Sequence, residues 1–212
     1  MPASGDDATA TFRGVVTVSH HTFYLVDDGR FPSPPLPETT TGLVDAATDA
    51  AVIRTGIHTG VIDVTCQALS GPPPLDLAGW DSAAEISIRA SIGQVTVASL
   101  GFDLPEQFPV LTPAGRGEYR ARVHARGRDT DIDGTASTPI ELYLIQVWPA
   151  PLDPPIVHLL TDRYGTELLS AQEHQATQPP PAEHHGRDER ADLLRANLLR
   201  AQNRGRTSRP GY

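Results

Sequence analysis

Short apolar segments that alternate with period two, separated by proline and glycine, limit the fold of this chain more than any other feature. Ile86 and Ile88 alternate with polar residues, whereas residues 142–148 form a nearly continuous apolar segment typical of a buried strand. Strands are expected over residues 11–18, 20–26, 51–55, 61–69, 80–90, 95–100, 118–125 and 140–148, with a shorter one over 156–160. This pattern predicts an all-β fold, a two-layer antiparallel β-sandwich over residues 11–170.

Proline, glycine and alanine mark the connections between these strands. Three proline-rich stretches are expected as loops or strand exits: FPSPPLP (31–37), GPPPL (71–75) and WPAPLDPP (148–155). Two short stretches are expected as hairpin turns: GIHTG (56–60) and SIGQ (91–94). Within the body, only GLVDAATDAA (42–51) has a helical pattern, which predicts one short helix there.

The two ends of the chain differ from this body in composition. Residues 1–10 are small and polar and are expected to be flexible. Residues 171–187 lack large apolar side chains, so a disordered linker is expected there. Residues 188–212 form an Arg-rich tail, in which Ala191, Leu194, Leu198 and Ala201 lie on one stripe of a short predicted helix.

Composition restricts the compartment and the covalent chemistry. Cys66 is the only cysteine, so no disulfide can form within the chain, and its alternation with Ile62 and Val64 predicts a core position. No apolar run approaches the ~20 residues of a membrane span. The first residues include acids and lack the apolar segment of a signal peptide. These features predict a soluble, cytoplasmic protein with no membrane partner.

Charge is distributed unevenly along the chain, whose net charge is −9. Residues 183–212 hold seven arginines and four acids, so the rest of the chain has a net charge of −12. An acidic body repels the phosphate backbone, which argues against direct binding of nucleic acid. All 17 basic residues are arginine, and none is lysine.

The stretch GEYRARVHARGRD (117–129) places small and apolar residues on one face of a predicted strand and basic residues on the other. Tyr119, Ala121 and Val123 are expected to face the core, whereas the basic stripe of Arg120, Arg122, His124 and Arg126 is expected to face solvent. Glu85, Asp63 and Glu141 are available as ion-pair partners. Two interpretations stay open for this stripe: a solvated outer face, or a surface that binds another protein.

The loop RDTDIDGT resembles the start of an EF-hand calcium loop, because Asp129, Asp131 and Asp133 alternate before Gly134. The twelfth position, which needs a bidentate glutamate, is Ile140. The loop is therefore either an exposed turn or the site of a calcium-binding, ligand-binding or enzymatic alternative.

The remaining histidine and catalytic patterns argue against a metal centre or an enzyme. His20 and His21 are adjacent in a predicted strand and point to opposite faces, while His184 and His185 lie in the predicted linker, so zinc is not expected. The nucleophile-elbow, P-loop, dinucleotide-binding and H-E-x-x-H motifs are missing from the sequence. We expect a non-enzymatic protein without a cofactor.

The order of several segments is similar to that of a known family. The shared residues are Ser19, His21, Phe23, Ala50, Ala51, Gly60, Gly117 and Tyr119, around the stretch AAVIRTGIHTGVIDVTCQAL. Over residues 15–150 the chain resembles the competence protein J (ComJ) family of small inhibitors of a DNA-entry nuclease. The resemblance implies a small β-sandwich that binds another protein, with a nuclease as the expected class of partner. It transfers no inhibitory residue to this chain.

Overall fold

A computed structural model of the chain describes residues 8–99, 101 and 108–177. The strands are β1 (Ala8–Ser19), β2 (Thr22–Asp27), β3 (Val44–Ala47), β4 (Ala50–Arg54), β5 (Thr59–Leu69), β6 (Ser82–Ala90), β7 (Val95–Ala98), β8 (Gly117–Arg126), β9 (Thr135–Ala136), β10 (Leu142–Pro149) and β11 (Ile156–Leu160), and one helix, α1 (Arg163–Thr177), follows them. The one helix among the described residues is not long and apolar enough to cross a membrane.

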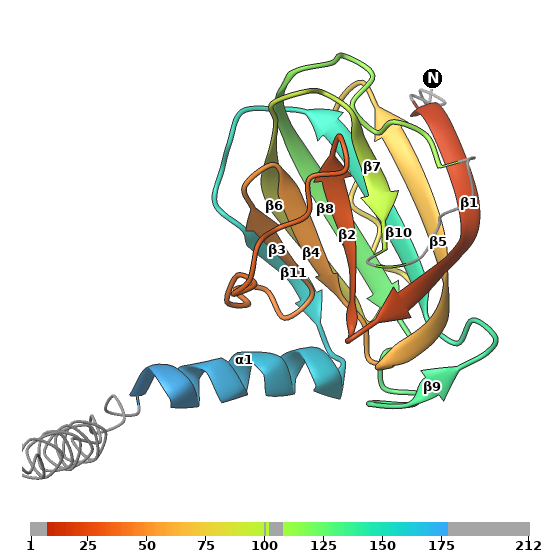
Figure 1. Ribbon diagram of the computed structural model, residues 1–212, viewed down its shortest axis with the longest axis vertical. Coiled ribbons are helices and arrows are strands. Elements are labelled where there is room, and N and C mark those ends of the chain that lie inside the picture. Colours follow the sequence, from red (N-terminus) through yellow and green to blue (C-terminus); the bar gives the residue numbers. More distant parts are fainter. Residues whose placement is uncertain (1–7, 100, 102–107, 178–212) are drawn as a thin grey trace, which may run out of the picture. The chain divides into compact units, whose positions relative to one another are not determined.

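The strands form one curled sheet rather than the expected two-layer sandwich. Their order is β11-β6-β8-β10-β5-β1-β2-β4-β3, and β7 and β9 pair with β2 and β5. The sheet is mixed, because β10 and the short β9 both run parallel to β5. In Figure 1, β2 passes in front of β8 and β10, so the sheet folds over onto itself. The two layers of the prediction are therefore two halves of one continuous sheet.

The curl encloses the main hydrophobic core. β1 pairs with β5 along its whole length and then turns into β2, with Ser19 opposite Thr22, which brings β2 and β4 over the first half of the sheet. The inner faces of both halves contribute fully buried side chains, including Phe23, Ile53, Ile86, Val123 and Ile145. Apolar burial at this scale is the main stabilising contribution to such a fold.

Each proline-rich stretch crosses the outer face of the strands that its connection skips. The connection from β2 to β3 skips β4, and residues 31–37 within it cover a second apolar cluster that includes Tyr24 and Val52. The connection from β5 to β6 skips β10 and β8, and that from β10 to β11 skips β8 and β6. We call residues 70–81 the first crossover and residues 150–155 the second crossover.

Three local predictions are wrong. The segment 42–51 is the β3–β4 hairpin instead of a helix, and its turn contains Asp49 at a positive φ of 54°. Residues 56–60 and 91–94 are not hairpin turns, because β4 does not pair with β5 and β6 does not pair with β7. Alanine favours a helix by intrinsic propensity, but tertiary packing overrides that propensity here, and which strands pair is decided by contacts distant in sequence.

Helix α1 was not predicted from the sequence, and its residues 171–177 extend into the predicted linker. Two acceptors satisfy the first backbone N–H groups: Asp162 accepts a hydrogen bond from Gly165, and Asp129 accepts one from each of Arg163 and Tyr164. The described residues up to Ala176 belong to one compact unit. The predicted tail helix, His184 and His185 lie outside the described residues.

Candidate functional site

The alternation of β8 is confirmed on its inner face and corrected on its outer face. Tyr119, Ala121 and Val123 are buried in the core as expected. Arg120, Arg122 and His124 were expected to face solvent, but they are only 3%, 6% and 1% exposed. Arg126, at the end of the strand, is exposed as expected. The basic stripe is thus mostly a buried layer, and its role in binding a partner stays a prediction.

Glu85 on the neighbouring strand β6 neutralises part of this buried charge. Its two carboxylate oxygens accept hydrogen bonds from Arg120 Nε at 2.9 Å and from Arg122 Nε at 3.0 Å. His158 Nε2 on β11 lies 3.2 Å from the same carboxylate. Burial by itself raises the pKa of Glu85, but the bonds from Arg120, His158 and Arg122 outweigh it and lower that pKa.

The same two arginines hold the two crossovers against the sheet. Arg122 Nη1 donates to the carbonyl oxygen of Pro73 at 3.1 Å, and its guanidinium stacks over the ring of Trp148. Arg120 Nη1 donates to the carbonyl oxygens of Asp153 at 2.7 Å and Pro154 at 3.1 Å. Proline residues offer carbonyl acceptors but no N–H donors, so a side chain that only donates is a suitable partner.

His124 is the least satisfied polar side chain of this layer. Neither of its ring nitrogens has a hydrogen-bond partner among the described residues, and its ring lies 5.4 Å from that of Trp80 in the first crossover. Burial, followed by the positive charge of Arg122, lowers the pKa of His124 to about 4. His124 is therefore neutral near pH 7, and protonation would place a charge in a buried layer.

A second buried cluster lies where the loop after β8 meets the start of α1. Arg128 is fully buried and forms a bidentate pair with Asp162, with both hydrogen bonds at 2.8 Å. Arg128 also donates to the carbonyl of Gly42. A Cβ at Gly56 would lie 1.8 Å from the Arg128 carbonyl oxygen, so only glycine allows this close approach.

Glu141 belongs to the same buried cluster. Its carboxylate accepts hydrogen bonds from the backbone N–H of Ile57 and from the hydroxyl of Tyr143, at 2.7 and 2.6 Å. Burial raises the pKa of Glu141, although these hydrogen bonds oppose the change. The buried carboxylates of Glu85, Asp162 and Glu141 all accept hydrogen bonds from groups of the same chain, so we interpret them as structural parts of the fold.

Three imidazoles meet at the turn between β1 and β2. His20 and His21 have positive φ angles of 54° and 60°, so they form the turn itself and not the strand that was expected. The ring of His58 lies about 5 Å from each of them. His21 Nε2 also lies 2.9 Å from Asp133, another residue with positive φ. This turn is strained relative to the Asn-Gly sequence that such turns prefer.

The aspartates of the predicted calcium loop have separate tasks. Asp129 binds the N-terminus of α1, Asp133 pairs with His21, and the carbonyl of Asp131 accepts the N–H of Gly134. In the part of the chain that the structure describes, no three His, Cys, Asp or Glu side chains are placed to hold a metal ion. The calcium alternative stays a prediction, and the positions of these carboxylates do not add support to it.

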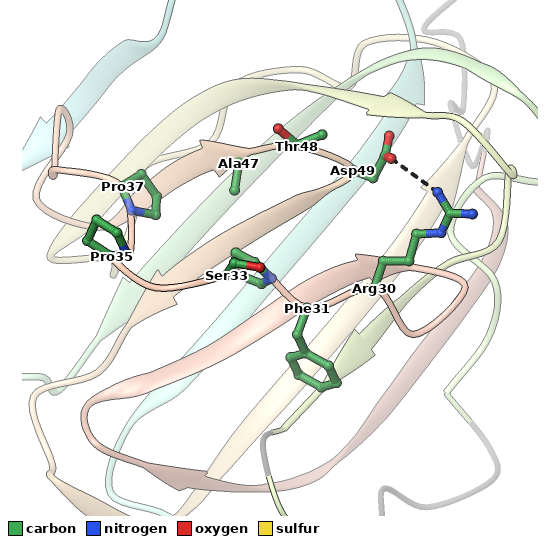
Figure 2. A pocket seen from close by; sticks show the side chains of 9 residues that line it. Arg30, Phe31, Ser33, Pro35, Pro37, Ala47, Thr48 and Asp49 are labelled. Carbon is green, nitrogen blue, oxygen red and sulfur yellow. Dashed lines mark ion pairs between the residues drawn. The ribbon is translucent and has the colours of Figure 1, made fainter.

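A pocket of about 500 Å3 lies beside the proline-rich stretch of residues 31–37. Figure 2 shows this stretch facing the β3–β4 turn, with Arg30 directed toward Asp49 at 3.6 Å. Prolines and small side chains form most of the lining. The pocket offers one cation, Arg30, and one carboxylate, Asp49, which already pair with each other.

Comparison with known proteins gives distant similarities only. No protein family matches the sequence, and no curated protein matches it. A solved structure described as crocagin biosynthetic gene J is 16% identical, with a TM-score of 0.45, and covers 67% of this chain and 98% of its own. The structure of ComJ, inhibitor of the DNA degrading activity of NucA, from Bacillus subtilis, is 12% identical, with a TM-score of 0.44, and covers 66% and 98%. These values assign neither a family nor a functional residue to this chain.

The sequence pattern did not predict that the two crossovers accept hydrogen bonds from the basic stripe. Glu85 was named as a possible ion-pair partner, and it does bind Arg120 and Arg122. The carbonyls of the first and second crossovers were not anticipated. Two facts could have indicated these contacts. A connection between strands that are not neighbours must cross a face of the sheet, and the carbonyl groups of a proline-rich segment need donors from outside that segment.

Proposed function

We propose that this protein is a non-enzymatic binding module that docks on a basic protein in the manner of an inhibitor or immunity-type protein. The first class of partner to test is a nuclease, because the residues around Ser19, His21 and Phe23 resemble those of the ComJ family. A nuclease must attract phosphates, so its cleft is basic and suits an acidic inhibitor.

One observation carries this proposal: most cations of the body are already paired with carboxylates of the same chain. Residues 1–182 hold ten arginines, and eight of them form ion pairs with carboxylates of the same chain. The same residues include 22 acids. Among the described residues, two exposed arginines, Arg116 and Arg126, take part in no ion pair. At least five exposed acids also take part in none: Asp28, Glu38, Asp76, Asp131 and Asp153. The unpaired surface charge is therefore negative, which steers basic partners toward the protein.

The test uses the purified full chain and a panel of purified non-specific DNA endonucleases with basic isoelectric points. Plasmid cleavage and calorimetric binding are measured at ~0.05 M and ~0.5 M salt, because screening weakens steering between exposed charges. We expect at least one nuclease to be inhibited near equimolar ratio, with weaker association at the higher salt. An unrelated acidic protein of similar net charge serves as the control.

Two results would refute the proposal. The first is inhibition by the control protein to the same extent, which would reduce the effect to non-specific charge attraction. The second is the absence of binding to every basic protein in the panel at the lower salt. Hydrolysis of a substrate by the purified chain alone would favour the enzymatic alternative.

A further inference from the structure

The sequence Pro-Leu-Asp occurs once in each crossover of the outer face, at residues 74–76 and 151–153. Both leucines are solvent-exposed, Leu75 at 47% and Leu152 at 43%. Both aspartates beside them, Asp76 and Asp153, are exposed as well. A single exposed leucine is normal, but exposed apolar side chains that gather on one face mark an interaction surface, so the relative position of these two segments matters.

Two arginines that are two positions apart on β8 and point to the same face hold these two segments. Arg122 donates to the carbonyl oxygens of Pro73 and Pro74, at 3.1 and 3.5 Å, and Arg120 donates to that of Asp153 at 2.7 Å. Positions two apart on a strand are separated by about 7 Å, so the two segments lie side by side on the outer face. Glu85 joins both arginines from below.

This arrangement fixes the exposed leucines before any partner arrives. Prolines restrict the backbone, and the arginine hydrogen bonds attach it to the sheet. A pre-ordered segment loses little conformational entropy when it binds, which favours affinity. Ile156, which lies opposite Glu85 in the β11–β6 register, adds a third exposed apolar side chain at 39%.

The chemistry of this surface indicates what it fits. Each leucine is followed in sequence by an exposed carboxylate, Asp76 or Asp153, whereas Arg120 and Arg122, which hold the segments, are buried. The exposed Arg89 lines the hollow beside Leu152, but it is paired with Glu118. A complementary partner presents an apolar recess bordered by lysine or arginine. A second copy of this acidic body would bring carboxylates against carboxylates, which is unfavourable.

We propose that the paired Pro-Leu-Asp segments of the two crossovers, with Ile156 beside them, form the surface that docks on a basic protein partner. This inference rests on the proposed function and adds the location and the anchors of the contact. Leu75 and Leu152 insert into the apolar recess of the partner, and Asp76 and Asp153 pair with its bordering cations.

Site-specific photo-crosslinking in the native host tests this location. The photoreactive residue p-benzoylphenylalanine replaces Leu75 or Leu152, and replaces Phe31 as the control. Phe31 is a comparably exposed aromatic on the other proline-rich stretch, at 38%. We expect the same basic protein to be captured at positions 75 and 152 but not at position 31.

Affinity measurements with the captured protein, once purified, complete the test. The double substitution Leu75→Ala with Leu152→Ala is expected to raise the Kd about tenfold or more, since anchors at an interface contribute most of its affinity. Phe31→Ala is expected to change the Kd less than about twofold. The melting temperature of the double variant should stay close to that of the wild type, because Leu75 and Leu152 are exposed. Phe31→Ala removes the ring contact with Tyr24, so its Kd is measured at a temperature at which circular dichroism shows the variant to be folded.

The outcomes separate the location from the function. Capture of a basic protein only at position 31 would overturn this location and leave the proposed function standing. Capture of no basic protein at any position would overturn both. Capture of an acidic protein or of a second copy at positions 75 and 152, or an unchanged Kd for the double variant, would also overturn the inference.

Discussion

Arg122 and Glu85 form a buried ion pair, with 3.0 Å between Nε and Oε2, beneath a proline-rich segment. Arg122 is thereby an internal connector that joins β8, β6 and the first crossover. Buried pairs are not strongly stabilising in themselves, but removing one member leaves the other without its partner.

Replacing Arg122 by alanine should therefore be costly. The variant loses the bond to Glu85, the bond to the Pro73 carbonyl and the stacking on Trp148. Glu85 keeps Arg120 and His158, which limits the loss of unfolding free energy to about 2–4 kcal/mol. Urea denaturation measures this difference.

Arg126 provides the matched control for that experiment. It lies on the same face of β8 but is exposed, so Arg126→Ala should change the unfolding free energy by less than about 0.5 kcal/mol. Equal losses in the two variants would contradict the structural role of Arg122. A small loss of unfolding free energy in both variants would instead support the solvated outer face that was predicted from the sequence.

His124 should make the protein less stable in acid. Its pKa is about 4 in the folded chain and 6.5 when unperturbed, so the unfolded state binds more protons between these values. The contribution is fully present above pH 6.5 and is lost as the pH falls toward 4. At ~1.4 kcal/mol per pKa unit, the difference of about 2.5 units corresponds to a full loss of roughly 3.5 kcal/mol below pH 4.

The variant His124→Leu isolates this contribution. Leucine has a similar volume and does not titrate, and neither ring nitrogen of His124 has a partner to lose. We expect the variant to be as stable as the wild type at pH 7 and more stable than it near pH 4.5, by denaturation at each pH. Glu85, whose pKa is lowered, also destabilises the fold in acid, but it is present in both proteins. Parallel pH profiles for the two proteins would refute the assignment to His124.

The inner face of the sheet could be predicted because it depends on local alternation. Tyr119 and Val123 follow the period-two rule, and Tyr119 finds a hydroxyl partner near the strand start, the carbonyl of Gly115. The burial of Arg122 could not be predicted in this way. It depends on β5 and β6 being separated by two strands, which forces the first crossover over the stripe.

The candidate site shows the same division between local and distant information. From the sequence, Leu75 and Leu152 could be assigned only to loops. That Arg120 and Arg122 lie beneath these loops and bind their carbonyl oxygens depends on contacts distant in sequence. The start of α1 had a local signal, because Asp162 stands at the N-cap position. Gly165 lies in the first turn of the helix, and because glycine is also typical of loops, the sequence around it did not predict a helix.

Cys66 should resist thiol reagents as long as the chain is folded. Its side chain is fully buried, and burial raises the pKa of the thiol well above its usual range, so the reactive thiolate is scarce. Reaction with a chromogenic disulfide reagent should be slow in buffer and rapid in denaturant. The unfolding rate should limit labelling in buffer, and stoichiometric labelling within seconds would contradict the core position.

Asp129 should stabilise the protein as a cap of α1 and not as a calcium ligand. Its two oxygens accept the N–H groups of Arg163 at 2.7 Å and Tyr164 at 2.9 Å. Asp129→Ala should therefore cost about 1–2 kcal/mol of unfolding free energy. Asp131 makes no side-chain hydrogen bond within the described part of the chain, so Asp131→Ala should be nearly neutral.

Calcium titration of the same proteins decides between the two roles. Because the oxygens of Asp129 are already engaged, millimolar calcium should leave the melting temperature of the wild type unchanged. A ligand that binds only the folded state must raise that temperature, by mass action. If calcium did raise it, and if Asp131→Ala abolished the increase, Asp129, Asp131 and Asp133 would form a calcium site after all. The loop would then have to rearrange and release the N-terminus of α1, which circular dichroism would detect as a loss of helix.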